Sequence, residues 1–549
     1  MSTSGSWLLA ALALLPLVGA AVVVALRGND RTAKLAALGF SVVEFVLALV
    51  AWASFEPGGA RLQQAFSFDW IPAFGVHISF GVDGIALVMI AVIALLVPLV
   101  IGAGWAEKLP EGRTAGGFFG LILLEQALTV GVFAATDVFL FYVLFEIMLI
   151  PMYFLIGSYG GARRQYAAVK FFLYSFLGGL IMLASVIGCY VMAGDELGQG
   201  TFDWATLVRV VSDAPLSTQI WLFLGFFIAF AVKAPLVPLH TWLPDATAEA
   251  PIGVAVLLVG ILDKVGTFGF LRYLLPMFPA ASAELAPLVL VLAVAGVVYG
   301  SLLATGQTDM KRFIAYVSIA HFGFIALGIF AFSSQAMTGS VTYMVNHSIA
   351  TGMLILVVGM VIARGGSTRI ADYGGMAKLT PLLAGVLLIA GLSTLSLPGT
   401  NSFVSEFLVL IGSFPNAPVF TAIATVGMVF AALYVLWLYQ RVMQGPLRGS
   451  ALVDSSGGGA GVDTARGGPG AARAAVLDPE VGAKKGIFDL NGREKAVLAP
   501  LLLLIVGLGV YPKPVLDTVA PTVDATMCEA RLVDPVQPVQ SAERQLQCP

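Results

Sequence analysis

Long apolar stretches run from the start of the chain almost to its end, and few charged residues interrupt them. Only 11% of the 549 residues are Asp, Glu, Lys or Arg, and 58% are apolar. A soluble domain carries about 25% charged residues, so this inventory cannot build a surface that faces water. The composition excludes a soluble enzyme, a nucleic-acid-binding protein and a disordered regulator. It predicts an integral membrane protein surrounded by the lipid bilayer.

A helix needs about 20 apolar residues to cross a bilayer, and stretches of that length recur throughout the chain. We therefore expect an all-α polytopic membrane protein with about 14 transmembrane helices. The predicted spans are 6–26, 33–54, 84–105, 115–135, 137–157, 168–193, 218–240, 252–274, 284–304, 312–332, 338–363, 381–412, 419–443 and 496–512.

Basic residues collect in alternate loops between these spans. The loop after the fifth span contains Arg163 and Arg164, and the loop after the ninth contains Lys311, whereas the loops 55–83 and 194–217 are poor in bases. Lys and Arg are enriched in cytoplasmic loops. This pattern predicts an external N-terminus, and an even number of spans returns the C-terminus to the same side.

The C-terminal part contains two polar segments. Residues 445–495 are rich in Gly and Ala, which predicts a flexible cytoplasmic insertion before the last span at 496–512. Residues 513–549 are expected to form a polar external tail. An external tail would place Cys528 and Cys548 in an oxidising compartment, where they could form a disulfide; the alternative is a disordered tail.

Two charges stand out within the apolar spans. Glu146 lies in FYVLFEIMLIPMYF and Lys233 in FFIAFAVKAPLVPLH. A charge in hydrocarbon costs at least about 2.5 kcal/mol on insertion scales, so each is a functional candidate. Pro235 and Pro238 follow Lys233 and should break the helix, and broken helices in membranes line polar interiors. The alternative for Glu146 is a structural carboxylate that binds a neighbouring helix.

Four further ionisable residues lie in apolar surroundings. Lys264 lies beside Asp263 in VGILDKVGTFGF, and because adjacent residues on a helix do not face each other, the two must serve different partners; a role for Asp263 stays open. Glu406 follows a second break, at Pro398 and Gly399. Glu125, in LILLEQALTV, is another carboxylate in mid-span.

Histidines add a possible proton relay. His321 and His347 lie within consecutive spans, and imidazole accepts and releases protons at physiological pH; the alternative is two satisfied core residues. His240, Asp245 and Glu249 lie in the polar motif HTWLPDATAEAP. We expect these three to fix a loop or to line an access mouth.

Together these groups form a titratable line through an apolar body, which suits proton translocation. Moving a carboxylate away from a buried lysine lets desolvation expel the lysine's proton. One helix break in each half of the chain points to an inverted-repeat transporter core. With three cysteines, four histidines, and no CxxC, HExxH or phosphate-binding glycine motif, we expect neither a metal nor a cofactor in this chain.

Four motifs closely resemble the antiporter-like, proton-pumping membrane subunits of respiratory NADH-quinone oxidoreductase (complex I). They are KAPLVPLHTWLPDATAEAP, QTDMKRFIAYVSIAHFGF, FEIMLIPMYFLIG and LPGTNSFVSEF. The resemblance runs from about the third to the thirteenth span and is greatest to the chain M type. It implies an N-terminal region at 1–114, and two inverted five-helix repeats, each with a broken helix, at 115–276 and 277–444. Each repeat would contribute a half-channel.

The resemblance also implies roles for the candidate residues. Glu146 would pair with Lys233. The path beyond them would run through Lys264, His321, His347 and Glu406. Protons would move along this axis, driven by NADH-to-quinone electron transfer in other subunits, so the chain would belong to a translocase without performing redox chemistry itself. The implied partners are other membrane and hydrophilic subunits of complex I, especially neighbouring antiporter-like subunits, in a bacterial plasma membrane.

Two other hypotheses compete with this one. The chain could belong to a multi-subunit cation/proton antiporter without a redox partner, but in that family, and in chain L of complex I, a lysine is expected where this sequence has Glu406. The chain could instead be a passive scaffold whose buried charges only bind helices together.

Overall fold

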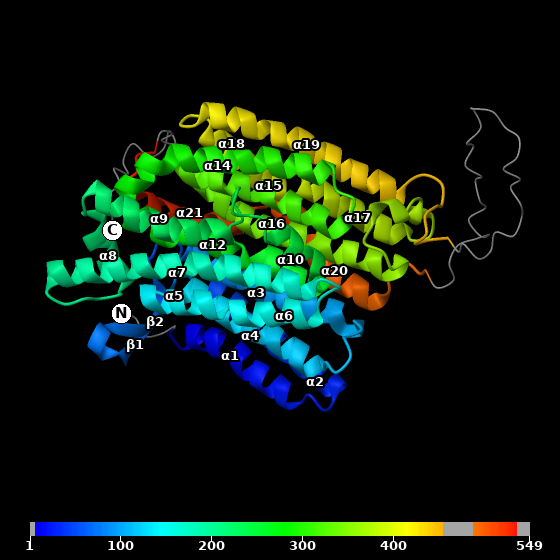
Figure 1. The fold of residues 1–549 in the computed structure, drawn as a ribbon, viewed down its shortest axis with the longest axis horizontal. Coiled ribbons are helices and arrows are strands. Elements are labelled where there is room, and N and C mark those ends of the chain that lie inside the picture. The colour runs from blue at the N-terminus through cyan, green and yellow to red at the C-terminus, as the bar shows by residue number, and fades with distance from the viewer. Residues whose placement is uncertain (1–5, 454–486, 535–549) are drawn as a thin grey trace, which may run out of the picture.

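The computed structural model describes residues 6–453 and 487–534, and its long helices lie side by side along one common direction (Figure 1). Within these residues, twelve helical stretches are long and apolar enough to cross a membrane. They are α1 (Ser6–Ala25), α2 (Asp30–Ala53), α3 (Gly84–Ala103), α4 (Ala115–Ala134), α5 with α6 (Val138–Ile147 and Leu149–Tyr159), α7 (Arg164–Leu197), α9 (Leu216–Lys233), the stretch Ile252–Met277, α14 (Pro279–Thr305), α15 (Met310–Phe330), α16 (Ser334–Gly365) and α19 (Pro418–Met443).

The two remaining predicted spans are broken helices. Predicted span 381–412 consists of α17 (Pro381–Thr394) and α18 (Asn401–Ser413), two short apolar helices separated by the predicted break. The last span consists of α20 (Gly492–Val510) and α21 (Lys513–Glu529), which meet at 68° and pass as one bent span. The polytopic all-α architecture predicted from the sequence is therefore confirmed, with twelve candidate spans in the described residues, a bent pair that could form a thirteenth, and two shorter apolar helices where a further span was expected.

The C-terminal segment differs from the expected polar tail. Residues 513–529 form a helix whose Val515, Val519 and Val523 are buried. Hydropathy hides this buried face because threonines alternate with the valines along it. Thr518 Oγ1 donates to the Pro514 carbonyl at 2.8 Å and Thr526 Oγ1 to the Thr522 carbonyl at 2.9 Å, so these hydroxyls are satisfied within the helix.

Proline also divides a span that the sequence predicted as continuous. The predicted helix 137–157 is two helices, α5 and α6, that meet at Met148. Pro151 lacks a backbone N–H, and its ring clashes with the carbonyl four residues earlier. That carbonyl belongs to Ile147, the last residue of α5, so the position of the break follows from the proline.

The external loop predicted at 55–83 contains a β-hairpin. Strands β1 (Gln63–Ile71) and β2 (Val76–Val82) pair antiparallel around a turn at Pro72–Phe74. Gly75 closes the turn with φ 61°, a conformation that costs little only for glycine. The apolar residues of β1 (AFSFDWI) alternate along the strand, which is typical of a β-strand. This pattern distinguishes β1 from the helical spans.

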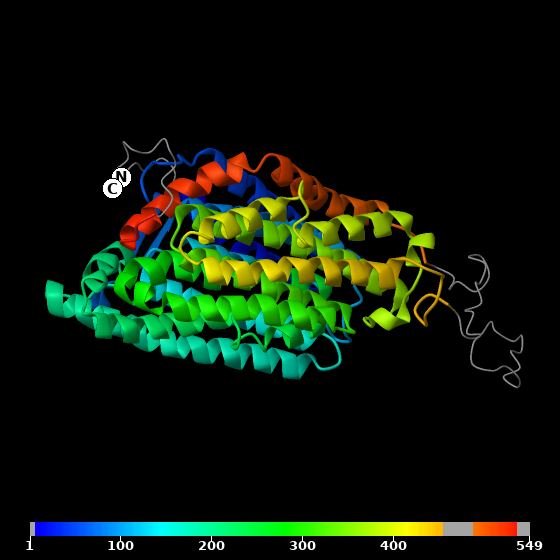
Figure 2. The ribbon, with the colours of Figure 1, turned by 90° about the horizontal axis from the view of Figure 1, so that it is seen from above.

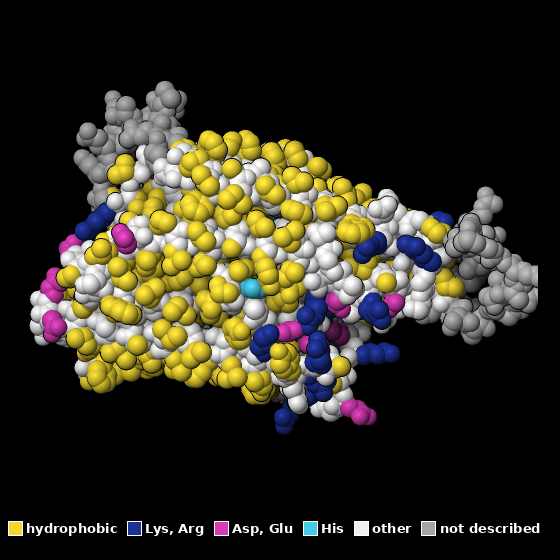
Figure 3. Space-filling model, turned by 45° about the horizontal axis from the view of Figure 1, so that its top comes forward, with side chains coloured by type: hydrophobic (Ala, Val, Ile, Leu, Met, Phe, Trp, Pro, Cys, Tyr) yellow, Lys and Arg dark blue, Asp and Glu magenta, His cyan; other side chains and the backbone are white. Residues whose placement is uncertain are grey.

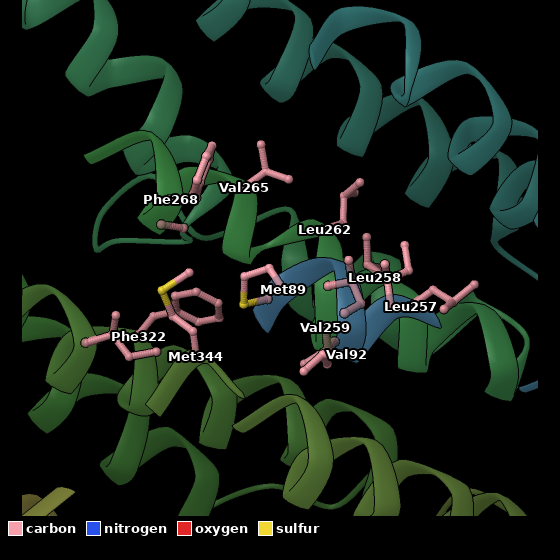
Figure 4. Close-up of a cluster of buried hydrophobic side chains, with 14 of the residues drawn as sticks. Met89, Val92, Leu257, Leu258, Val259, Leu262, Val265, Phe268, Phe322 and Met344 are labelled. Carbon is pink, nitrogen blue, oxygen red and sulfur yellow. The ribbon is translucent and has the colours of Figure 1, made fainter. Parts of the chain in front are cut away.

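The centre of the bundle is formed by α3, the stretch Ile252–Met277, α15 and α16, which are the most completely buried spans. Ile252–Met277 is not a regular helix: α11 (Ile252–Leu257), α12 (Lys264–Gly269) and α13 (Leu275–Met277) are separated by π-helical turns at Leu258–Leu262 and Phe270–Leu274. Figure 4 shows Met89 of α3, Val259 and Phe322 of α15 in one apolar cluster. The candidate residues lie among these central helices.

Apolar side chains cover the middle of the surface in Figure 3, and charged groups collect toward the two ends. On this face Lys and Arg gather toward one end, with Asp and Glu among them, and the charged side chains at the other end are mostly Asp and Glu. The basic end is the one where α20 begins and where the predicted insertion is anchored (Figure 2). Residues 454–486 of the insertion, and Cys548, lie outside the described residues, so the predictions about flexibility and the disulfide stay predictions.

Candidate functional site

The seven residues predicted from the sequence come from seven different helical segments. Six of them are at most 4% exposed, and only Glu146 of α5 is partly exposed. They are Glu125 (α4), Glu146 (α5), Lys233 (α9), Lys264 (α12), His321 (α15), His347 (α16) and Glu406 (α18). The structure arranges them in two groups, one around Lys233 and one that begins at Lys264.

Lys233 is the last residue of α9, because the helix ends at the predicted proline-rich break. Its ammonium group lies over two aromatic rings, 5.0 Å from the centroid of Phe145 and 5.7 Å from that of Phe171. Lys233 Nζ has no hydrogen-bond partner among the described residues. Cation–π contacts with two rings are therefore its direct stabilisation inside the bundle.

Glu146 and Lys233 do not form the direct ion pair that the resemblance implies. Among the described residues, no ion pair within 4.0 Å contains either residue, although the two interact electrostatically. The Glu146 carboxylate instead lies against Gly179 of α7, where an added Cβ would come within 1.5 Å of Oε1. The absence of a side chain at position 179 thus provides the space for this carboxylate.

Two further carboxylates act on Lys233. Glu125 and Asp263 each interact electrostatically with the ammonium group, as Glu146 does. Glu125 Oε1 accepts a hydrogen bond from Thr129 at 3.4 Å, whereas both Asp263 oxygens lack a partner among the described residues. A single lysine therefore lies within reach of three carboxylates, and Asp263, whose role the sequence left open, belongs to this group.

Lys264 begins α12 one residue after the π-helical turn Leu258–Leu262, with Asp263 between them. Its Nζ donates to the carbonyl of Val259 within that turn and lies 2.7 Å from His347 Nδ1. The ring of Phe322 packs 4.9 Å from the same nitrogen. Single π-helical turns in helices are frequent at functional sites; here one presents a backbone carbonyl to a buried lysine.

The two histidines lie next to each other, as the relay hypothesis requires. When Lys264 is protonated it can only donate to His347 Nδ1, and in that state the hydrogen is on Nε2, which can donate to Ser318 Oγ 3.1 Å away. The rings of His347 and His321 have centroids 5.2 Å apart, and that of His321 lies 5.6 Å from the ring of Tyr343.

Glu406 lies immediately after the second break. Tyr343 Oη donates to Glu406 Oε2 at 3.1 Å, and Ser396 Oγ donates to the same oxygen. Ser396 has φ 60°, in the left-handed region, which orients its hydroxyl at a backbone cost that the surrounding structure must sustain. The break is fixed to α16 because Asn346 Nδ2 donates to the Asn401 carbonyl at 2.8 Å.

Sequence reasoning missed the hydroxyl groups of this site. Tyr343, Ser318 and Ser396 carry no charge, and residues of these types occur in many apolar spans, so composition does not mark them. The one usable signal is the spacing of Tyr343 and His347, four residues apart, which places both on one face of a helix.

The polar motif after the first break forms an anchor at the basic end. Asp245, in α10 (Leu243–Glu249), binds Lys170 of α7 at 2.8 Å and also pairs with Arg312 of α15. Burial opposes ionisation of Asp245, but its hydrogen bond with Lys170 and the two positive charges hold its pKa below the ordinary value. Glu249 accepts the backbone N–H of Arg163 at 2.9 Å. These contacts support the predicted loop-fixing role.

A second ionic cluster, at the opposite end, was not predicted. The carboxylate of Asp83, which caps α3, lies 2.8 Å from Arg61 Nη1 and 2.7 Å from Arg272 Nη2. Arg61 Nε also donates to Glu529 of α21 at 3.0 Å. This cluster joins the chain before the β-hairpin to α3, to the end of Ile252–Met277 and to the C-terminal helix.

No group of three His, Cys, Asp or Glu side chains in residues 6–453 and 487–534 is placed to hold a metal ion. The groups described above can do acid–base chemistry. Carboxylates, ammonium groups, imidazoles and hydroxyls that succeed one another inside an apolar body can pass protons from one to the next.

Comparisons with known proteins show the family of the chain. Residues 135–433 match the family described as NADH:quinone oxidoreductase/Mrp antiporter, transmembrane. The NADH-quinone oxidoreductase subunit M of Mycobacterium tuberculosis (strain H37Rv) is 44% identical, with 97% of this chain and 96% of that protein covered.

Two solved structures have the same fold. A chain in respiratory complex I from Thermus thermophilus with bound NADH is 31% identical, with a TM-score of 0.80 and coverage of 95% of this chain and 99% of that one. A chain of the Mrp complex from Dietzia sp. also has a TM-score of 0.80, but at 21% identity over 95% of this chain and 98% of that one it shows the fold alone. The chain therefore belongs to the family of antiporter-like membrane subunits represented by subunit M of NADH-quinone oxidoreductase.

Proposed function

We propose that this protein is a proton-translocating membrane subunit of an NADH-quinone oxidoreductase, and that protons cross it along the buried residues described above. The full-length similarity to a protein named subunit M supports the first part. The second part depends on one observation: six of the seven candidate acid–base residues are almost fully buried in a bundle whose core is mainly apolar.

The cluster around Lys233 and the chain from Lys264 to Glu406 would act in sequence. The ammonium group of Lys233 interacts electrostatically with Glu146, Glu125 and Asp263. A change in the positions of these carboxylates would therefore change how firmly Lys233 holds its proton. Asp263 and Lys264 are neighbours in sequence, which connects the two groups. Electron transfer from NADH to quinone would occur in other subunits, and this chain would respond to it without redox chemistry of its own.

The domain organisation and location belong to the same proposal. Residues 115–276 and 277–444 would form two inverted repeats, each with one of the breaks at Lys233 and Glu406. The subunit would lie in a bacterial plasma membrane with its basic end toward the cytoplasm and both termini outside. Its partners would be the other membrane and hydrophilic subunits of the oxidoreductase, including neighbouring antiporter-like subunits.

The alternative function is that of a subunit in a multi-subunit cation/proton antiporter. The family model covers both kinds of protein, and the Mrp chain has the same fold. The two functions differ in their partners, because only the oxidoreductase subunit should purify with NADH:quinone oxidoreductase activity. Purification of the tagged chain in mild detergent, followed by assay of that activity, separates them.

Substitutions at Lys233 and Glu146 then test the site. We expect Lys233→Ala and Glu146→Gln to abolish NADH-driven proton translocation in membrane vesicles while the complex still assembles, because each variant removes a titratable group and places no new charge in the core. Lys378→Ala and Glu196→Gln, at exposed positions, are matched controls and should translocate normally. Retained translocation in both site variants would contradict the assignment, and loss of assembly would favour the scaffold hypothesis.

A further inference from the structure

Tyr343 lies at an interruption in the series of buried groups from Lys264 to Glu406, between His321 and Glu406. It lies on α16, one turn before His347, and its side chain is fully buried. On one side its ring lies 5.6 Å from that of His321. On the other side its hydroxyl donates to Glu406 at 3.1 Å. It is therefore in contact with both ends of the interruption.

The chemistry of the phenol suits this position. A tyrosine hydroxyl has one hydrogen to donate and lone pairs that accept, so it can receive a proton and release another without rotating a charged group through the core. His321 Nδ1 has no hydrogen-bond partner among the described residues. A ring rotation of His321, or one intervening water, would complete the connection to Tyr343.

We propose that Tyr343 is the hydroxyl relay that passes protons between His321 and Glu406, an inference that rests on the proton-translocating function proposed above. In the transfer toward Glu406, an N–H bond of the His321 imidazolium breaks and its proton forms a new O–H bond at Tyr343 Oη. The original Oη–H bond breaks at the same time, and that proton forms an O–H bond at Glu406 Oε2. The phenol is neutral before and after, and no oxidant or reductant takes part.

A purely structural role for Tyr343 would make different predictions, and the chain offers a matched control. Tyr273 is also a fully buried tyrosine in a membrane span, and its hydroxyl donates to the Ala135 carbonyl at 3.0 Å. Its acceptor is a backbone oxygen, which cannot take up a proton to pass it on. Tyr343→Phe and Tyr273→Phe therefore each remove one buried hydroxyl and one hydrogen bond, but only the first removes a relay.

The test uses the whole oxidoreductase complex reconstituted into liposomes, with proton uptake driven by NADH oxidation. We expect Tyr343→Phe to lose translocation to the same extent as Glu406→Gln, because general acid–base groups contribute about 100-fold or more to proton-transfer rates. Tyr273→Phe removes no such group and should retain at least about half of the activity. The amount of assembled complex is measured for each variant. Translocation in Tyr343→Phe equal to that in Tyr273→Phe, with Glu406→Gln inactive, would overturn the relay and leave the proposed function intact.

Normal translocation in Glu406→Gln would instead contradict the proposed path itself. If Tyr343→Phe fails to assemble, a second variant decides: 3-fluorotyrosine at position 343 keeps the hydroxyl and the shape but makes the phenol more acidic. A relay predicts that the pH profile of translocation shifts with that substitution. An unchanged profile in a normally assembled complex would overturn the proposal.

Discussion

At the scale of single residues, the site depends on small and aromatic neighbours as much as on its charges. Phe145 and Phe171 face the ammonium group of Lys233, and Phe322 faces that of Lys264. Aromatic faces attract a cation without providing a base that would take its proton, so each lysine can be held in the core and still exchange its proton with a carboxylate or imidazole. Gly179 has the complementary role of leaving space for Glu146.

This dependence makes position 179 a sharp test of the Glu146 assignment. In Gly179→Ala, the new Cβ would lie 1.5 Å from Glu146 Oε1, so the carboxylate must move. We expect proton translocation to fall about tenfold or more, because small misplacements of reacting groups have large kinetic effects, with no change in any titratable residue. Gly194→Ala on the same helix meets only ordinary contacts, at 3.6 Å, and should translocate normally. Equal activity in the two alanine variants would show that the position of Glu146 is unimportant.

The charged members of the site could be predicted from the sequence because a charge is rare in an apolar span and carries a cost there. Tyr343, Ser396 and Ser318 could not, since burying an uncharged hydroxyl costs far less than burying a charge, so a hydroxyl in an apolar segment does not stand out. Their importance comes from tertiary neighbours, such as the pairing of Tyr343 with Glu406 across two helices, and single-sequence patterns contain no information on such neighbours.

At the scale of elements, helix breaks were predictable and their supports were not. Prolines predicted the breaks after Lys233 and before Glu406, but the helix α21 was missed because threonine hides its buried face. The start of α17 is supported from far along the chain. Asp489 accepts hydrogen bonds from the backbone N–H groups of Leu382, at 2.7 Å, and Leu383, at 3.0 Å, while the N-cap residue Thr380 makes no side-chain cap.

Replacement of Asp489 should therefore loosen the broken helix from its basic end. Loss of a capping carboxylate costs about 1 kcal/mol, so we expect Asp489→Ala to lower the melting temperature of the detergent-solubilised protein, with exposed Asp195→Ala as the control. Burial opposes ionisation of Asp489, but hydrogen bonds from Leu382 and neighbouring N–H groups lower its pKa. A carboxylate whose pKa is lowered by folding stabilises the fold when the pH is above its ordinary pKa of about 3.9. This contribution disappears as the pH falls through the folded-state pKa. The difference in melting temperature between Asp489→Ala and the parent should have its full size at neutral pH and become smaller in acid. A difference that does not depend on pH would contradict the capping role.

At the scale of the whole molecule, the two ends of the bundle have opposite character. The basic end carries Lys170, Arg312 and Arg364, each paired with a carboxylate, while the other end is closed by the cluster of Asp83 with two arginines. That cluster ties α21 to α3 through Glu529, so the C-terminal helix forms part of the bundle. Removing one partner of a buried ion pair destabilises a fold strongly, so these ion pairs hold this end of the bundle together, opposite the anchored break at Asp245.

Orientation in the membrane is the property of the whole molecule that follows from this asymmetry, and cysteine labelling tests it. Ala60 lies in the loop before the β-hairpin and Glu111 in the loop between α3 and α4, and both are exposed. Because basic loops stay in the cytoplasm, a membrane-impermeant maleimide should label Ala60→Cys in intact cells above the level of the parent chain. Glu111→Cys should react only after permeabilisation, which also serves as the control that its thiol is accessible. The reverse pattern would place the Lys170–Asp245–Arg312 anchor outside the cell and would contradict the predicted orientation.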